Sequence, residues 1–201
     1  MDLESIQSDL DFIRGVVDNN RKVFIDNGLM FISSGIFVAI GLMMNYVLVA
    51  LNLQDYILYA WGGWVVLIII TNMILGTKHQ TKLGIKTFAS EMFSHTWLAI
   101  GIPIMIFFIV FIITGTPEFN AFVAATASML GIGYFLTGYI TDSNMMKILG
   151  GGWWIGALFF LLWNNISDME TLGLVFSLMV LIFQIVPGIT IYRKWKRIYN
   201  G

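Results

Sequence analysis

The sequence predicts an all-α integral membrane protein, a six-transmembrane-helix bundle preceded by a cytoplasmic amphipathic N-terminal helix. Of its 201 residues, 58% are hydrophobic and only 11% are charged, whereas soluble domains carry roughly 25% charged residues. The apolar residues are gathered into runs that approach the ~20 residues needed to cross the hydrocarbon core of a bilayer. The lipid bilayer is therefore the first expected partner, and no feature predicts nucleic-acid binding.

Residues 1–24 are predicted to form the cytoplasmic amphipathic helix. Its apolar side chains recur at steps of three and four, the spacing of a helical seam, and these residues are Leu3, Ile6, Leu10, Ile13 and Val17. Several of the other positions are acidic, whereas a helix that lies on an anionic lipid surface is basic. We therefore expect the seam to dock on protein: the chain's own inner loops, a second copy, or a separate cytoplasmic partner.

Six apolar runs follow and are predicted to span the membrane within a domain of residues 28–192. Their expected bounds are 28–50, 56–75, 97–114, 120–140, 148–163 and 173–192. Between the second and third runs, "TKHQTKLGIKTFASEMFSHT" fits either an interfacial helix or an extension of the third span. Pro103 and Pro187 are expected to kink their helices, because proline removes one backbone hydrogen bond.

The charged residues are segregated by side. All 11 Lys and Arg residues fall in the N-terminal segment, the second and fourth loops and the basic cytoplasmic tail of residues 193–201, which share one side of the predicted spans. The charged residues expected on the other side are all acidic: Asp55, Glu118, Asp168 and Glu170. Basic residues near span ends stay in the cytoplasm, so both termini are predicted to be cytoplasmic.

No Asp, Glu, Lys, Arg or His lies in the middle of a predicted span. Buried ionisable groups of this kind mark proton relays, ion pathways and intramembrane catalysis. The chain has no cysteine, and its two histidines, His79 and His95, do not complete a metal site with Glu91. We therefore predict no catalytic residue, no cofactor and no metal. An intramembrane enzyme would require these groups and Asp142 to converge on a metal ion.

Uncharged polar residues and tryptophans remain as candidates to line a solute path. Gln184 is the most central and the most costly to leave unpaired in lipid, so we expect it to face the bundle interior. The other candidates are Asn45, Asn72, Ser128, Trp64 and Trp153. The tryptophans belong to "WGGW" in the second span and "GGGWW" in the fifth. Glycine-interrupted segments at matching positions of two halves are typical of inverted-repeat transporters, although helix packing explains the same residues.

Small residues in the fourth and fifth spans predict close helix packing. Those of the fourth span follow one another at helical spacing and are Ala121, Ala124, Ser128, Gly131 and Gly138. In the fifth span, Gly152 and Gly156 form a GxxxG pair. We expect leucine at Gly152 to damage assembly and alanine at Gly150 to be tolerated, unless the three glycines form a functional break in the helix.

The segments "DFIRGVVDNNRKVF" and "LMFISSGIFVAIG" resemble the opening of small uncharacterised bacterial six-span inner-membrane proteins with a short cytoplasmic N-terminal helix. The resemblance covers residues 1–45. It implies a six-span architecture and location in the bacterial inner (plasma) membrane, and it carries no catalytic residue across.

These observations favour two functions. The first is a non-enzymatic membrane protein that acts as an interaction or regulatory module, through its cytoplasmic helix or by self-association into a homo-oligomer. The second is a small transporter or channel for an uncharged or amphipathic solute, with a site near Gln184 and the Gly/Trp segments of spans two and five.

Overall fold

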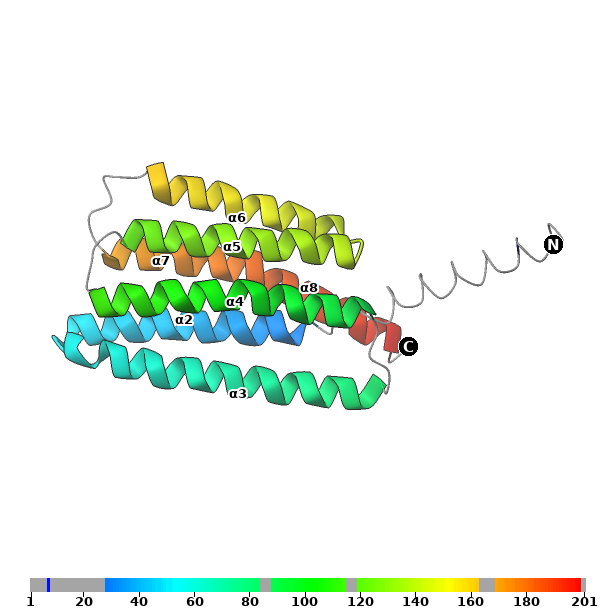
Figure 1. Cartoon of the computed structure of the whole chain (residues 1–201), viewed down its shortest axis with the longest axis horizontal. Coiled ribbons are helices and arrows are strands. Elements are labelled where there is room, and N and C mark those ends of the chain that lie inside the picture. The colour runs from blue at the N-terminus through cyan, green and yellow to red at the C-terminus, as the bar shows by residue number, and fades with distance from the viewer. Residues whose placement is uncertain (1–6, 8–27, 84–87, 115–118, 163–168, 200–201) are drawn as a thin grey trace.

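The computed structural model describes residues 7, 28–83, 88–114, 119–162 and 169–199, and every regular element among them is helical. The helices run side by side along one long axis (Figure 1). In lipid, a helix satisfies its own backbone hydrogen bonds, which is why apolar runs of this length fold as helices. The expected all-α fold is confirmed.

Among the described residues, five helices are long and apolar enough to cross a membrane. They are α2 (Leu29–Ala50), α4 (Phe88–Thr114), α5 (Phe119–Ile140), α6 (Asn144–Leu162), and one continuous rod made of α7 (Met169–Val180), the π-helical turn η2 (Leu181–Ile185) and α8 (Val186–Tyr199). A short 3-10 turn, η1 (Gln54–Tyr56), leads into α3 (Ile57–Leu83), whose apolar stretch is shorter, Ile57–Thr71. Such helices indicate a membrane protein.

Several helices extend beyond the bounds expected from the sequence. Helix α4 begins at Phe88 rather than near residue 97, so residues 88–96 extend the third apolar run instead of forming a separate interfacial helix. Helix α6 begins at Asn144 rather than 148, and α8 continues through most of the expected tail to Tyr199. The predicted seam lies outside the described residues: Leu3, Ile6, Leu10, Ile13 and Val17.

Two of the connections end a helix in the same way. Asn52 and Asp142 have left-handed backbone conformations, with φ of 57° and 50°. In each case the following N–H donates to a carbonyl five residues earlier, from Leu53 to Leu48 and from Ser143 to Gly138, both at 2.8 Å. This is the Schellman arrangement, which satisfies the last carbonyls of a helix. Asn and Asp tolerate the left-handed region better than most residues.

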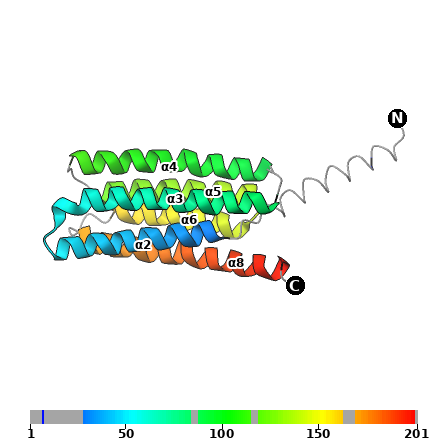
Figure 2. The same ribbon diagram turned by 90° about the horizontal axis from the view of Figure 1, so that it is seen from below.

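The core lies between α5, α6 and the α7–α8 rod, with contributions from α2 and α4. Its most deeply buried large side chains include Tyr134, Trp153, Phe160 and Leu172. No described residue of α3 belongs to this core. Helices α6 and α3 lie at opposite edges of the bundle (Figure 1), and a view turned by 90° places α4 and α8 at the other two edges (Figure 2).

The π-helical turn explains how one long rod stays in contact with the bundle. Buried positions recur along the rod at steps of four, at Leu172, Phe176, Val180, Gln184 and Gly188, and Pro187 is buried beside the last of these. In an α-helix of 3.6 residues per turn, each step of four drifts by ~40°. The π turn holds more residues per turn, and its Val186 N–H bonds the carbonyl of Leu181. It therefore cancels part of the drift and keeps the stripe facing inward.

Candidate functional site

Gln184 lies in the π-helical turn and is 7% exposed. Its Nε2 donates a hydrogen bond of 2.7 Å to the Oγ of Ser34 on α2. The Ser34 hydroxyl in turn donates to the carbonyl of Met30 at 2.6 Å. Gln184 thus faces the interior, as its cost in lipid predicts, and its amide is tied to the backbone of α2 through one hydroxyl.

Glycines bring α2 close enough for this bond. A side chain at Gly35 would lie 2.6 Å from Cγ1 of Ile185, and one at Gly188 would lie 2.8 Å from Cγ1 of Ile32. Gly28 has φ +68°, and a Cβ there would clash with the carbonyl oxygen of Gly188. Pro187 stands between the π turn and Gly188, and it has no N–H to continue the α-helical ladder. The close contact between α2 and the rod therefore depends on the absence of side chains at these glycines.

An aromatic cluster fills the interior beside this pair. The Tyr134 ring lies 5.4 Å from that of Phe31 and 6.3 Å from that of Trp153, and Trp153 lies 5.8 Å from Phe183, the neighbour of Gln184. Tyr134 and Trp153 are both fully buried. The Tyr134 hydroxyl, Trp153 Nε1 and Thr126 Oγ1 have no hydrogen-bond partner among the described residues. The interior is thus closely packed and still holds unused donors.

A second polar link crosses the cluster. Trp97 Nε1 of α4 donates to Oγ1 of Thr137 on α5 at 3.2 Å, and Thr137 is buried. Ser34, Tyr134 and Thr137 were not predicted from the sequence as interior residues. Tyr134 and Thr137 are three residues apart, which is the spacing of one helix face. This spacing was the sequence feature that could have placed both of them in the interior.

The other solute-lining candidates do not converge on Gln184. Trp61 Nε1 donates to Oδ1 of Asn45 at 3.4 Å, and Trp64 Nε1 donates to the carbonyl of Phe37 at 2.7 Å, so these residues join α3 to α2. The carbonyl of Ser128 accepts from Trp154 Nε1 at 3.2 Å, in the contact between α5 and α6. The side chain of Asn72 lies outside the described part. Of the candidates, Trp153 contacts the ring of Phe183, which precedes Gln184 in the chain.

The predicted packing residues of α5 and α6 lie in helix contacts. The expected difference between Gly150 and Gly152 is reversed in the structure. A Cβ at Gly150 would lie 2.8 Å from the carbonyl oxygen of Gly131 and 2.9 Å from the backbone nitrogen of Phe135. At Gly152 the nearest atom is the ring end of Phe183 at 3.2 Å, and Gly156 faces the side-chain end of Met179. A ring or a methionine end can shift, whereas backbone cannot. The expectation that Gly150 tolerates alanine therefore disagrees with the geometry.

The small-residue stripe of α5 follows the same contact only in part. Ala124 is buried and Gly131 faces Trp154 and Gly150, whereas Ala121 is exposed. The three glycines of "GGGWW" do not interrupt α6. The glycines of "WGGW" differ from Gly150 and Gly152, because nothing lies within 4 Å of a Cβ at Gly62 or Gly63, as is also the case at Gly151.

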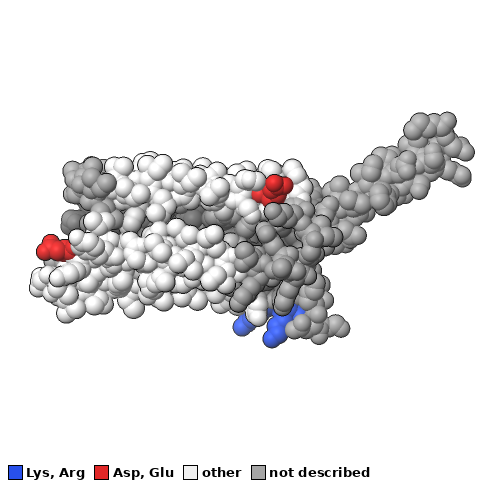
Figure 3. Space-filling model, turned by 60° about the horizontal axis from the view of Figure 1, so that its bottom comes forward, with Lys and Arg blue, Asp and Glu red and all other residues white. Residues whose placement is uncertain are grey.

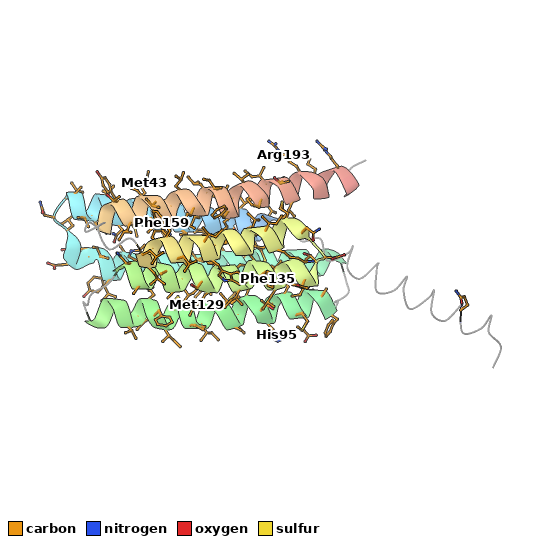
Figure 4. All side chains as sticks on the ribbon, turned by 90° about the horizontal axis from the view of Figure 1, so that it is seen from above. Met43, His95, Met129, Phe135, Phe159 and Arg193 are labelled. Atoms are coloured by element: carbon orange, nitrogen blue, oxygen red, sulfur yellow. The ribbon has the colours of Figure 1, made fainter. Side chains whose placement is uncertain are left out.

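The described charged residues lie toward the ends of the bundle. Figure 3 shows the visible Lys and Arg side chains together at one end, with uncharged surface along the sides. His95 and Arg193 project from opposite sides of the bundle toward that same end, while Met43 lies nearer the other (Figure 4). Within the described ranges, no group of three or more His, Cys, Asp or Glu side chains could hold a metal ion.

No protein-family model, curated protein or solved structure matches this chain.

Proposed function

We propose that the protein is a non-enzymatic membrane protein that acts as an interaction module and associates within the bilayer with a second copy of itself. The observation that carries this proposal is the uncovered face of α3. A Cβ added at Gly62 or Gly63 would have no neighbouring atom within 4 Å, so a second helix can approach the backbone there. Close approach at small residues is the common basis of helix association in lipid.

The side chains around these glycines support the same contact. Trp61 and Trp64 turn toward α2, where their indole nitrogens are hydrogen-bonded. On the next turns, exposed apolar side chains continue the surface, and they are Val66, Leu67, Ile69 and Ile70. Helix α3 also stands at the edge of the bundle (Figure 1). A partner helix could therefore lie along it without displacing the core.

The closely packed interior favours this function over a continuous aqueous pore. Fully buried Tyr134, Trp153 and Phe160 occupy the middle of the core. Their rings are in contact with further aromatic rings from α2, α4 and α7. Passage of a solute through this region would require several large side chains to move together.

The topology we propose places α3 across the membrane as a sixth span, with both termini in the cytoplasm. Its apolar stretch Ile57–Thr71 is shorter than the others, but the helix continues to Leu83. The supporting observation is charge: the Lys and Arg side chains visible in Figure 3 lie at one end of the bundle. Cytoplasmic loops carry such an excess. The resemblance of residues 1–45 favours the bacterial inner membrane as the location.

Energy transfer between labelled chains in liposomes tests the association. We expect transfer in the wild-type chain that falls as lipid dilutes it, and a roughly tenfold higher dissociation constant for Gly63→Leu, which corresponds to about 1.4 kcal/mol. Gly173→Leu is the matched control, because Gly173 of α7 also has nothing within 4 Å. Transfer that is absent at every dilution, or equal in Gly63→Leu and the wild type, would overturn the proposal.

Deletion of residues 1–22 distinguishes this surface from the predicted cytoplasmic seam. We expect the deleted chain to associate as the full chain does. Loss of energy transfer on deletion, with Gly63→Leu still associating, would move the contact to Leu3, Leu10 and Val17 and away from α3.

The buried polar pair favours a second candidate, a transporter for an uncharged or amphipathic solute. Its basis is the bond from Gln184 to Ser34 in a π-helical turn, since such turns are frequent at functional sites. Flux of a small neutral solute into proteoliposomes, reduced in Gln184→Leu while that variant remains folded, is the outcome this candidate requires. Absence of flux in the wild-type chain would remove it.

A further inference from the structure

A lysine and an aspartate are held side by side where α5 turns into α6. Lys147 Nζ lies 3.6 Å from Oδ1 of Asp142 and 4.7 Å from the centre of the Tyr139 ring. The Asp142 side chain is 69% exposed and that of Lys147 is 25% exposed. Both charges are therefore accessible from outside at one end of two apolar helices.

The backbone of the turn places these two residues next to each other. Asp142 has φ 50°, and the Ser143 N–H donates to the carbonyl of Gly138. The Lys147 N–H donates to the carbonyl of Ser143 at 3.2 Å. A Cβ at Gly138 would lie 2.7 Å from the backbone nitrogen of Lys147, so the absence of a side chain lets the turn fold beneath the lysine. The turn thus brings the backbones of these two residues together.

An aromatic strip leads from the charged pair along the outside of the bundle. The rings of Tyr139 and Phe135 are 5.1 Å apart, and those of Phe135 and Trp154 are 5.2 Å apart. Tyr139 and Trp154 are exposed, and Trp154 is anchored by its bond to the Ser128 carbonyl. A membrane-facing strip of this kind offers a firm apolar surface to one acyl chain.

We propose that this surface binds a phospholipid with a zwitterionic headgroup that ends in a primary ammonium, as in phosphatidylethanolamine. The phosphate pairs with Lys147, the ammonium pairs with Asp142, and one acyl chain lies on Phe135 and Trp154. A net anionic headgroup would meet Lys147 but be repelled by Asp142. A quaternary ammonium has no N–H to donate to the carboxylate. The inference rests on the membrane crossing of α5 and α6, and it is independent of the α3 contact.

Native mass spectrometry of the detergent-solubilised chain tests this preference. The micelles contain equal amounts of phosphatidylethanolamine, phosphatidylglycerol and phosphatidylcholine with identical acyl chains. We expect the wild-type chain to retain phosphatidylethanolamine about threefold over each of the others, the scale of one exposed ion pair. Asp142→Asn should reverse the order in favour of phosphatidylglycerol, and Lys147→Gln should lower retention of all three.

Asp55→Asn is the control, because Asp55 is an exposed carboxylate in the turn before α3, on a different connection from the proposed site. Equal retention of the three lipids by the wild-type chain would overturn the proposal, as would an unchanged order in Asp142→Asn. Neither outcome bears on Gly63→Leu, so failure of the lipid site is distinguishable from failure of the association.

Discussion

Glycines behave in opposite ways in two regions of this bundle. Between α5 and α6, Gly131 and Gly150 bring backbones together, and a Cβ at Gly150 would lie 2.8 Å from a carbonyl oxygen. On α3, Gly62 and Gly63 meet nothing within 4 Å. The same residue type therefore marks an internal contact in one region and an unused surface in the other. In lipid, where apolar burial gives helices little reason to associate, such close contacts decide the packing.

The largest expected effect comes from Gly150→Ala. Because the added methyl group would meet the backbone of Gly131 and Phe135, the two helices must separate, and we expect a loss of about 3 kcal/mol in the free energy of unfolding. Gly151→Ala is the control one position along, where nothing lies within 4 Å, and it should change stability by less than about 0.5 kcal/mol. Thermal unfolding in micelles measures both. Equal stability of the two variants would contradict the backbone contact between α5 and α6.

Ser34→Ala is expected to have an intermediate effect. It leaves the buried Nε2 of Gln184 without its acceptor, at a cost of about 1 kcal/mol. Gln184→Leu should cost less, because the Ser34 hydroxyl keeps its bond to the Met30 carbonyl. A double-mutant cycle over the two positions measures their coupling. Full additivity of the two losses would show that the bond contributes nothing to the α2 contact.

The sequence was sufficient for the helical fold, because runs of apolar residues and the backbone's need for hydrogen bonds in lipid leave few alternatives. It also placed Gln184 toward the interior. Its proposed role in a solute path stays a prediction. The small residues of α5 and α6 could be identified as packing positions because their size and their helical spacing are visible in the sequence.

Which glycine of α6 meets the backbone of α5 could not be predicted in this way. Gly150 and Gly152 are two positions apart on α6, and the rotation of α6 against α5 decides which one meets backbone. That rotation depends on how side chains of both helices, such as Trp154 and Phe135, pack across the contact. The step of four from Leu172 to Gly188 is a feature of the sequence that fits a π-helical turn. Whether these residues face the bundle interior depends on where the partner helices lie.

The smallest effect is expected at Gly63, and it separates the two uses of glycine most sharply. Gly63→Ala adds a methyl group where nothing lies within 4 Å, so the free energy of unfolding of the single chain should stay within about 0.5 kcal/mol of the wild type. Because alanine also permits close helix approach, energy transfer between chains should persist, whereas Gly63→Leu should weaken it. If alanine destabilises the single chain as much as Gly150→Ala does, then α3 is covered by its own chain and the proposed surface does not exist.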